Sequence, residues 1–289
     1  PHLVESNLAF NRHRVGGHCI YHFAVELLDG HCYCLASVVV AQRVLDKVFG
    51  HTFEPGIQAY DELALLRQKL QRDQQPITVT DHGAGSMVQA SPRRLVKDIA
   101  RYSAVPPSVG ELLFRLVLFC RPGKMLELGS SLGISAIYQA AAARKADFIT
   151  IEGDPTLAQM AATHLKQQGL PQVDVWQGPF AERLPGALQR LSSLDYLYLD
   201  GDHRAGASMQ YFETCLPYAH ADSVFVIADI YWSREMQQAW QRMCAHEAVR
   251  LSVDLFDVGL LFFRKEQKER AHYKLVPAKY KPWRMGFLG

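Results

Sequence analysis

Lys124-Met-Leu-Glu-Leu-Gly-Ser-Ser-Leu-Gly-Ile-Ser-Ala-Ile-Tyr138 has the order of a short strand, a glycine loop and a helix. Met125 and Leu126 are typical of a buried strand, and the run from Ile134 has apolar residues at helical spacing. Gly129 and Gly133 bracket a sharp turn, where a ligand can approach a backbone that has no Cβ atom. The stretch therefore predicts a ligand-binding βα turn.

The spacing of these glycines excludes two common phosphate sites. A dinucleotide fingerprint is Gly-x-Gly-x-x-Gly, a P-loop ends in Gly-Lys-Ser/Thr, and neither pattern is present. The order here is Glu-x-Gly-x-x-x-Gly, with Glu127 at the end of the strand and no lysine to meet a phosphate. An uncharged ribose and an amino-acid head group suit this loop better than a pyrophosphate does.

A second acid follows at the spacing expected of a ribose contact. Asp147-Phe-Ile-Thr-Ile-Glu152 reads as a strand whose last residue lies about 20 positions after Gly133, as in nucleotide-binding βαβ units. Asp154 is expected to cap the next helix, with Pro155 in its first turn. The alternative for Glu152 is a solvated acid beside that helix.

Later strands deliver more acids to the same edge of a parallel sheet. Leu194–Leu199 leads into Asp200-Gly-Asp-His203, and Ser223–Ala228 leads into Asp229. Helix capping alone does not explain so many polar residues at strand tips. Five acids and a histidine are expected to face one crevice: Glu127, Glu152, Asp200, Asp202, His203 and Asp229. Arg250–Phe256 and Val258–Arg264 are joined too tightly for a helix and predict an antiparallel hairpin.

The motifs resemble those of class I S-adenosylmethionine-dependent methyltransferases, in the O-methyltransferase-like branch related to catechol and macrolide O-methyltransferases. The resemblance covers residues 76–265. It rests on Glu127-Leu-Gly-Ser-Ser-Leu-Gly133, Ile151-Glu-Gly-Asp154, Asp200-Gly-Asp-His203 and Ala228-Asp-Ile-Tyr-Trp-Ser233. It implies an α/β, Rossmann-like fold, with a mostly parallel seven-stranded sheet, an antiparallel terminal hairpin and an N-terminal, mainly helical cap.

The resemblance also implies a cofactor, S-adenosyl-L-methionine, and the residues that hold it. Pro179 stands where relatives often have an acid, so adenine recognition would depend on backbone groups and Phe180. The residues expected to bind the cofactor are Glu127, Gly129, Ser130, Ser131, Gly133, Glu152, Gly178, Phe180 and Asp200.

The implied reaction is in-line transfer of the sulfonium methyl group to a hydroxyl of a small-molecule acceptor, with positioning as a large part of catalysis. His203 is the leading general base, because an imidazole ordinarily titrates near neutral pH. Asp200 or Asp229 is the alternative base, or orients the acceptor. The competing interpretation is that His203 caps the helix that begins near Arg204.

Metal-dependent relatives bind a divalent ion with an acid at the fourth strand tip and an Asp-Asp or Asp-Asn pair at the fifth. Asp200 and Asp229 match two of these positions, but Ile230 replaces the third ligand. Two carboxylates and waters can still hold magnesium. We therefore expect a site without metal and keep a magnesium ion on Asp200 and Asp229 as the alternative.

Length and composition do not decide the fold, but they limit the kinds of binding partner that the chain is expected to have. The chain has 289 residues, 31 basic against 29 acidic, so nothing demands nucleic acid or an anionic membrane. No apolar run reaches the roughly 20 residues of a membrane helix, and no signal-peptide pattern is visible. Six irregularly spaced cysteines do not indicate a secreted disulfide scaffold. A cytoplasmic protein without a membrane partner is expected, and a homodimer stays open.

Three regions are expected: an N-terminal helical cap or lid (1–105), the methyltransferase domain (106–265) and a C-terminal tail (266–289). The cap is predicted to contain helices over 41–49, 60–71 and 92–102. Residues 77–91 are predicted to form a loop that brings Asp81 or Ser86 to the site. The spacing of His18, Cys19, His22, Cys32 and Cys34 fits no common zinc pattern, and partial burial is the default for them.

Three other functions remain in view. Pro179 and Ile230 depart from catalytic relatives, which suits a regulatory protein that binds a nucleoside without turnover. The basic, aromatic segment Lys279-Tyr-Lys-Pro-Trp-Arg284 admits RNA methylation. A nicotinamide oxidoreductase is disfavoured by the missing fingerprint. The acceptor is not readable, because cap and insertions build its pocket.

Overall fold

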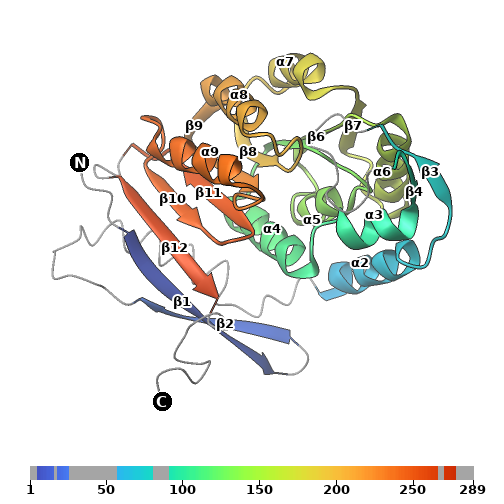
Figure 1. Cartoon of the computed structure of the whole chain (residues 1–289), viewed down its shortest axis with the longest axis horizontal. Helices are drawn as coiled ribbons and strands as arrows, with labels where there is room; N and C mark the ends of the chain where they lie inside the picture. Colours follow the sequence, from blue (N-terminus) through green and yellow to red (C-terminus); the bar gives the residue numbers. More distant parts are fainter. Residues whose placement is uncertain (1–4, 16–17, 26–56, 81–90, 266–269, 278–289) are drawn as a thin grey trace.

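The computed structural model describes residues 5–15, 18–25, 57–80, 91–265 and 270–277. One large sheet runs through this part of the chain, with helices on both faces (Figure 1). The sheet has ten strands in the order β2-β1-β12-β10-β11-β9-β8-β5-β6-β7.

The centre of the sheet is the one that the sequence predicts. Strands β5 to β9 pair in parallel, β11 lies antiparallel to β9, and β10 lies antiparallel to β11. Their bounds are β5 (Lys124–Leu128), β6 (Asp147–Glu152), β7 (Val173–Gln177), β8 (Leu194–Leu199), β9 (Ala219–Ala228), β10 (Leu251–Asp254) and β11 (Val258–Phe262). The mostly parallel seven-stranded arrangement with a terminal hairpin is confirmed.

Two layers of helices bury this central sheet. One face carries α4 (Pro107–Cys120), α5 (Ile134–Ala142) and α6 (Pro155–Gln167). The other carries α7 (Phe180–Leu191), α8 (Ala205–Cys215) and α9 (Arg234–Ala245). Successive side chains of a strand point to opposite faces, so Met125 packs in the first layer and Leu126 in the second. A sheet buried on both faces needs such nearly continuous apolar strands.

Three further strands extend the sheet beyond the prediction. β12 (Ala271–Pro277) pairs in parallel with β10, β1 (Glu5–Val15) pairs in parallel with β12, and β2 (His18–Val25) lies antiparallel to β1. The expected helical character of the N-terminal region is therefore wrong for residues 5–25. Without β12, one edge of β10 would be unpaired and open to another strand, and local sequence does not reveal which segment occupies it.

The remaining N-terminal segment combines helices with a short ribbon. It contains α2 (Ile57–Leu70), β3 (Pro76–Thr78), β4 (Arg93–Leu95) and α3 (Val96–Tyr102). Both predicted helices exist, but the second starts later, because β4 pairs with β3. On α2, Leu63, Leu66 and Leu70 are buried, whereas Leu65 is 66% exposed. The helix predicted over 41–49, the segment 279–284 and residues Cys32, Cys34, Asp81 and Ser86 lie outside the described residues.

Whether a helix in the described part of the chain can span a membrane depends on its length and apolar content. No single helix there is both long and apolar enough to cross a bilayer. The pair α3 and α4 passes that test only when joined, and the two are bent by 66° at their break. Half of the residues of α4 are buried in the core.

Gly129 marks the closest approach between the loop after β5 and the end of β8. Its φ is +102°, and a Cβ atom there would lie 2.1 Å from the carbonyl oxygen of Asp200. Gly206, in the first turn of α8, has no atom within 4 Å of the same added atom. The two glycines therefore form a matched pair for substitution: an added side chain would meet backbone atoms at Gly129 and open space at Gly206.

Gly129→Ala is expected to lower the free energy of unfolding by about 2–4 kcal/mol, because the left-handed backbone and the backbone clash both oppose a side chain. Gly206→Ala is expected to raise it by about 0.5–1 kcal/mol through helix propensity. Urea denaturation of both variants measures the difference. Equal, small effects would show that the contact between Gly129 and Asp200 does not constrain the fold.

Candidate active site

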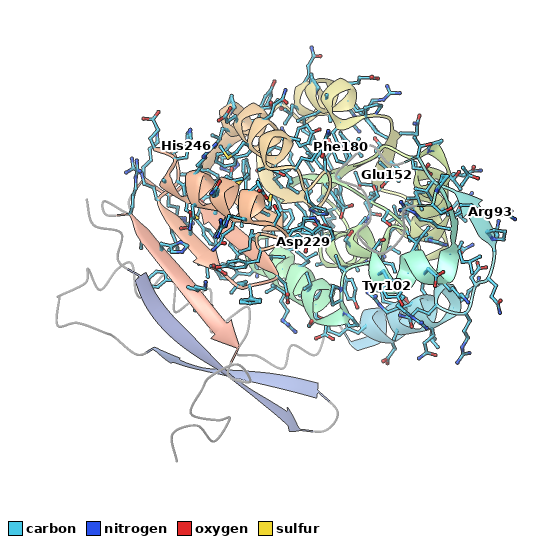
Figure 2. The ribbon with its side chains drawn as sticks, in the orientation of Figure 1. Arg93, Tyr102, Glu152, Phe180, Asp229 and His246 are labelled. Atoms are coloured by element: carbon cyan, nitrogen blue, oxygen red, sulfur yellow. The ribbon has the colours of Figure 1, made fainter. Side chains whose placement is uncertain are left out.

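A cavity of about 530 Å³ opens at the carboxyl ends of the parallel strands. Its walls come from the glycine loop after β5, from the tips of β6 to β9 and from the N-terminal segment. An N-terminal wall agrees with the predicted cap and with the predicted loop 77–91, but the sequence did not single out its residues, which include Val79, Thr80, Ile99, Tyr102, Ser103 and Val105. Figure 2 shows Tyr102, Glu152, Phe180 and Asp229 among the side chains of this region.

Glu152 is held rigidly at the tip of β6. Its Oε2 accepts a hydrogen bond from the Ser131 backbone N–H at 2.7 Å, and its Oε1 accepts one from the Asp154 N–H at 3.0 Å. Burial raises the pKa of this carboxyl above its usual value, and the two backbone bonds oppose the rise. Glu152 lines the cavity. A fixed carboxylate with further acceptor capacity suits the hydroxyls of a ribose.

Asp154 connects this tip to the N-terminal segment. One carboxylate oxygen caps α6 by accepting from the Leu157 N–H at 2.8 Å, as the sequence predicts. The other accepts from the Thr80 N–H at 2.7 Å. The wall formed around Thr80 is therefore bonded directly to the residue that caps α6.

Glu127 does not line the cavity, contrary to the expectation that it binds the cofactor. It is fully buried beneath the glycine loop and accepts hydrogen bonds from Gln139 at 2.8 Å and Thr150 at 2.5 Å. The reason is its position one residue before the end of β5, where its side chain points into the layer below. Gly133 and Gly178 are also absent from the cavity wall, whereas Gly129, Ser130 and Ser131 belong to it.

Phe180 forms the wall near the tip of β7. Its ring lies over Gly201, where an added Cβ atom would come within 2.6 Å of it. The same ring meets Tyr211 edge-to-face, with 5.7 Å between the centroids. Pro179 and Phe180 both line the cavity. This part of the wall is therefore apolar, in keeping with the proline that stands where relatives often have an acid.

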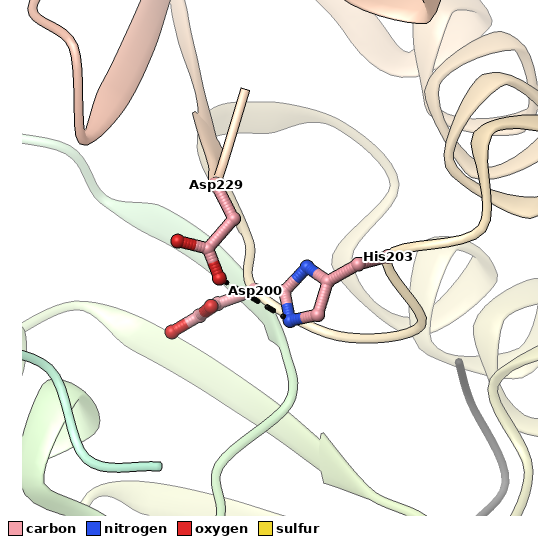
Figure 3. A group of neighbouring side chains, drawn as sticks. All are labelled: Asp200, His203 and Asp229. Atoms are coloured by element: carbon pink, nitrogen blue, oxygen red, sulfur yellow. Dashed lines mark ion pairs between the residues drawn. The ribbon is translucent and has the colours of Figure 1, made fainter. Parts of the chain in front are cut away.

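Asp200, His203 and Asp229 converge at one end of the cavity (Figure 3). One donor atom from each lies within 4.8 Å of the others, and His203 Nε2 is 3.4 Å from Asp229 Oδ2. Burial raises the pKa of Asp200 to about 6; His203 opposes the rise and Asp229 adds to it. Burial also raises the pKa of Asp229. Burial therefore opposes the charged form of both carboxyl groups, and the nearby His203 favours it.

The backbone and a salt bridge hold His203 toward this cluster. Asp202 has a positive φ of 53° and binds Arg204 through Nε at 2.5 Å and Nη2 at 2.7 Å. The N-cap of α8 is Arg204, and no side chain caps that helix. The alternative in which His203 is the helix cap is therefore wrong. Its ring instead lies beside Trp232, with 5.2 Å between the centroids.

Several wall residues escaped sequence reasoning. Thr80 takes part through its backbone and Tyr211 through packing, so neither carries a sequence signal. Tyr102 lines the cavity at the end of α3, and its 55% exposure, which is unusual for a large aromatic residue, shows only in the folded structure. Asp202, expected to act at the rim, is chiefly the partner of Arg204.

Glu127 yields a prediction about pH and stability. Burial raises its pKa to about 7, with hydrogen bonds from Thr150 opposing the rise. Because the folded-state pKa exceeds the unfolded value of about 4.3, the favourable contribution of the protonated group is complete below pH 4 and is lost as the pH rises toward 7. Glu127→Gln removes this loss. The variant is expected to gain stability relative to the wild type between pH 4.5 and 8, measured by urea unfolding.

The exposed carboxylate of Glu213 on α8 provides the control for that experiment. Glu213→Gln is expected to follow the wild-type dependence on pH. A Glu127→Gln curve parallel to the wild type would contradict a neutral, buried Glu127 below pH 7.

Comparisons with known proteins agree with this geometry. Residues 126–230 match the family model described as a methyltransferase domain. A catechol O-methyltransferase of Niastella koreensis is 32% identical over 102 residues, which cover 34% of this chain and 46% of that protein. The chain thus matches less than half the length of this curated relative.

Solved structures share the fold at low identity. An O-methyltransferase of Bacillus cereus, in complex with SAH, has a TM-score of 0.51 at 17% identity, covering 77% of this chain and 96% of that one. A SAH-bound methyltransferase of Podospora anserina has a TM-score of 0.53 at 14% identity, covering 82% and 100%. The resemblance predicted from the sequence is confirmed at the level of the fold: residues 126–230 match the methyltransferase-domain model, and the described chain shares the Rossmann-like fold of these solved methyltransferases.

Proposed function

We propose that this chain is an S-adenosylmethionine-dependent methyltransferase that methylates a hydroxyl oxygen of a small molecule. The observation that carries the proposal is the position of two different groups in one cavity. A carboxylate suited to a ribose lies on one side, and a histidine with two acids lies on the other. The catechol O-methyltransferase of Niastella koreensis supports the choice of a hydroxyl acceptor.

The residues of the first side fit the nucleoside part of the cofactor. Glu152 would accept from the ribose hydroxyls, and Phe180 would pack against the adenine. Ser131 Oγ is buried in the loop, and among the described residues it has no hydrogen-bond partner. A buried hydroxyl in that state costs free energy unless a ligand satisfies it. When bound, the cofactor supplies an electrophilic methyl group.

The second side would activate the acceptor. A hydroxyl bound among Asp200, His203 and Asp229 would give its proton to His203 Nε2, which would make the hydroxyl oxygen a stronger nucleophile. The Asp229 carboxylate, 3.4 Å from that nitrogen, would stabilise the imidazolium that forms. Trp232 would limit the tilt of the imidazole ring, which keeps the proton acceptor in line with the bound hydroxyl.

A divalent cation also fits these groups by chemistry. Asp200 and Asp229 would hold it, and it would lower the pKa of the acceptor hydroxyl. We favour a site without metal, because Ile230 is fully buried in the core and contributes no ligand. His203 is then the one imidazole in the cluster of three, beside two carboxylates.

Binding without turnover is the alternative function. It would retain the cofactor side and lack transfer to any hydroxyl. The His203–Asp229 contact favours catalysis over this alternative, because a purely nucleoside-binding protein does not need a base aimed at the other end of the cavity.

Glu152→Gln is expected to weaken S-adenosylmethionine binding by about 10- to 100-fold, the size of losing charge-assisted hydrogen bonds. Calorimetric titration of the wild type and the variant measures the dissociation constants. Glu213→Gln on α8 serves as the control and should bind like the wild type. Equal affinity in the Glu152 variant would remove the ribose contact from the proposal.

His203→Gln is expected to lower kcat by about 100- to 10,000-fold, with cofactor affinity unchanged. Methylated catechol, detected by mass spectrometry, serves as the first readout, followed by other hydroxyl acceptors. Wild-type activity should survive EDTA. A loss on chelation that magnesium restores would contradict the metal-free site, and cofactor binding with no methylated product would favour the non-catalytic alternative.

A further inference from the structure

Two polar pairs join β12 to β10. In the parallel register Ser252 lies opposite His272, and Asp254 lies opposite Lys274. Ser252 Oγ is 2.8 Å from His272 Nδ1. Residues two apart on a strand share a face, so both pairs lie on one side of the sheet. A slip of one residue would bring apolar partners to these positions, and the polar pairs therefore fix the register of β12.

The second pair contains a buried charge. Asp254 is only 2% exposed, and Lys274 Nζ lies 3.9 Å from its Oδ2. The same ammonium donates to the Tyr231 hydroxyl at 2.5 Å and lies 4.7 Å from the centre of that ring. The Tyr231 hydroxyl in turn donates to Asp254. A buried carboxylate needs a counter-charge and hydrogen bonds. Lys274 supplies the counter-charge, Tyr231 donates to Oδ2, and the Phe256 N–H donates to Oδ1 at 2.9 Å.

Tyr231 belongs to the loop that carries the acceptor-side residues. Asp229 and Trp232 line the cavity, Ile230 is buried in the core beneath, and Tyr231 bonds instead to β10 and β12. The loop is tight: Asp229 has a φ of 51°, and the Trp232 N–H donates to its carbonyl at 2.9 Å. Tyr231 therefore links the two cavity residues on either side of it to a fixed point in the sheet.

We propose that Lys274 is a positioning residue for the acceptor side of the cavity. Through Tyr231 it fixes the loop 229–232, and with it the Asp229 carboxylate beside His203 and the Trp232 ring against His203. Lys274 itself does not line the cavity. Its effect on catalysis rests on the proposed function, whereas its effect on the loop does not.

The test compares Lys274→Met, which keeps the length of the side chain and removes its charge, with Lys274→Arg, which keeps the charge. Hydrogen exchange followed by mass spectrometry reports the amides of Asp229 and Trp232. Lys274→Met is expected to speed their exchange about tenfold or more, because the loop opens locally without its anchor. Lys274→Arg should restore most of the protection.

Kinetics supply the second readout. With catechol as the probe, Lys274→Met is expected to raise the acceptor KM and lower kcat/KM about tenfold, while the calorimetric affinity for S-adenosylmethionine stays unchanged. If the wild type methylates no acceptor, the proposed function fails, and the exchange experiment alone still decides the role of Lys274.

His272→Ala is the matched control, because it removes the other polar pair between β12 and β10 and lies farther along the strand from Tyr231. It should destabilise β12 without speeding exchange at Asp229 and Trp232. Two results would overturn the proposal: unchanged loop exchange in folded Lys274→Met, or equal loop exchange in the Lys274→Met and His272→Ala proteins.

Discussion

The close backbone contact between the end of β5 and the end of β8 is the constraint on which the rest of the site depends. The Asp200 N–H donates to the Leu128 carbonyl at 2.9 Å, and Gly129 lets the Asp200 carbonyl lie where any other residue would place a Cβ atom. This contact brings the loop that holds the nucleoside side and the tip that carries the acceptor side into one cavity.

Local sequence predicted the parts of this arrangement that depend on strand tips. Alternating strands and helices, the terminal hairpin and the convergence of Glu152, Asp200, His203 and Asp229 all follow from local pattern and from the rule that parallel strands end at one edge. Glu127 shows the limit. It differs from Glu152 by one position relative to the end of its strand, and that single step turns its carboxylate into the core.

The features of the site that the sequence did not reveal depend on contacts between segments far apart in the chain. Thr80 enters the site through a backbone N–H, which any residue other than proline would supply. Lys274 acts across a strand pair, and its partner Asp254 lies on the other side of a hairpin and a loop. Neither residue belongs to a motif. Both matter only because the folded chain brings distant segments together, and no periodicity records such a meeting.

The pairing of β1 with β12 has a consequence for the order of folding. Glu5 lies opposite His272, so this contact closes a loop around the whole methyltransferase domain. Such long-range closure is slow and gains little until its neighbours are in place. The central strands can assemble without it, whereas the N-terminal hairpin must wait for β12. The central strands and the β10–β12 pair that carries Lys274 join segments close in sequence, so both can form before β1 enters the sheet.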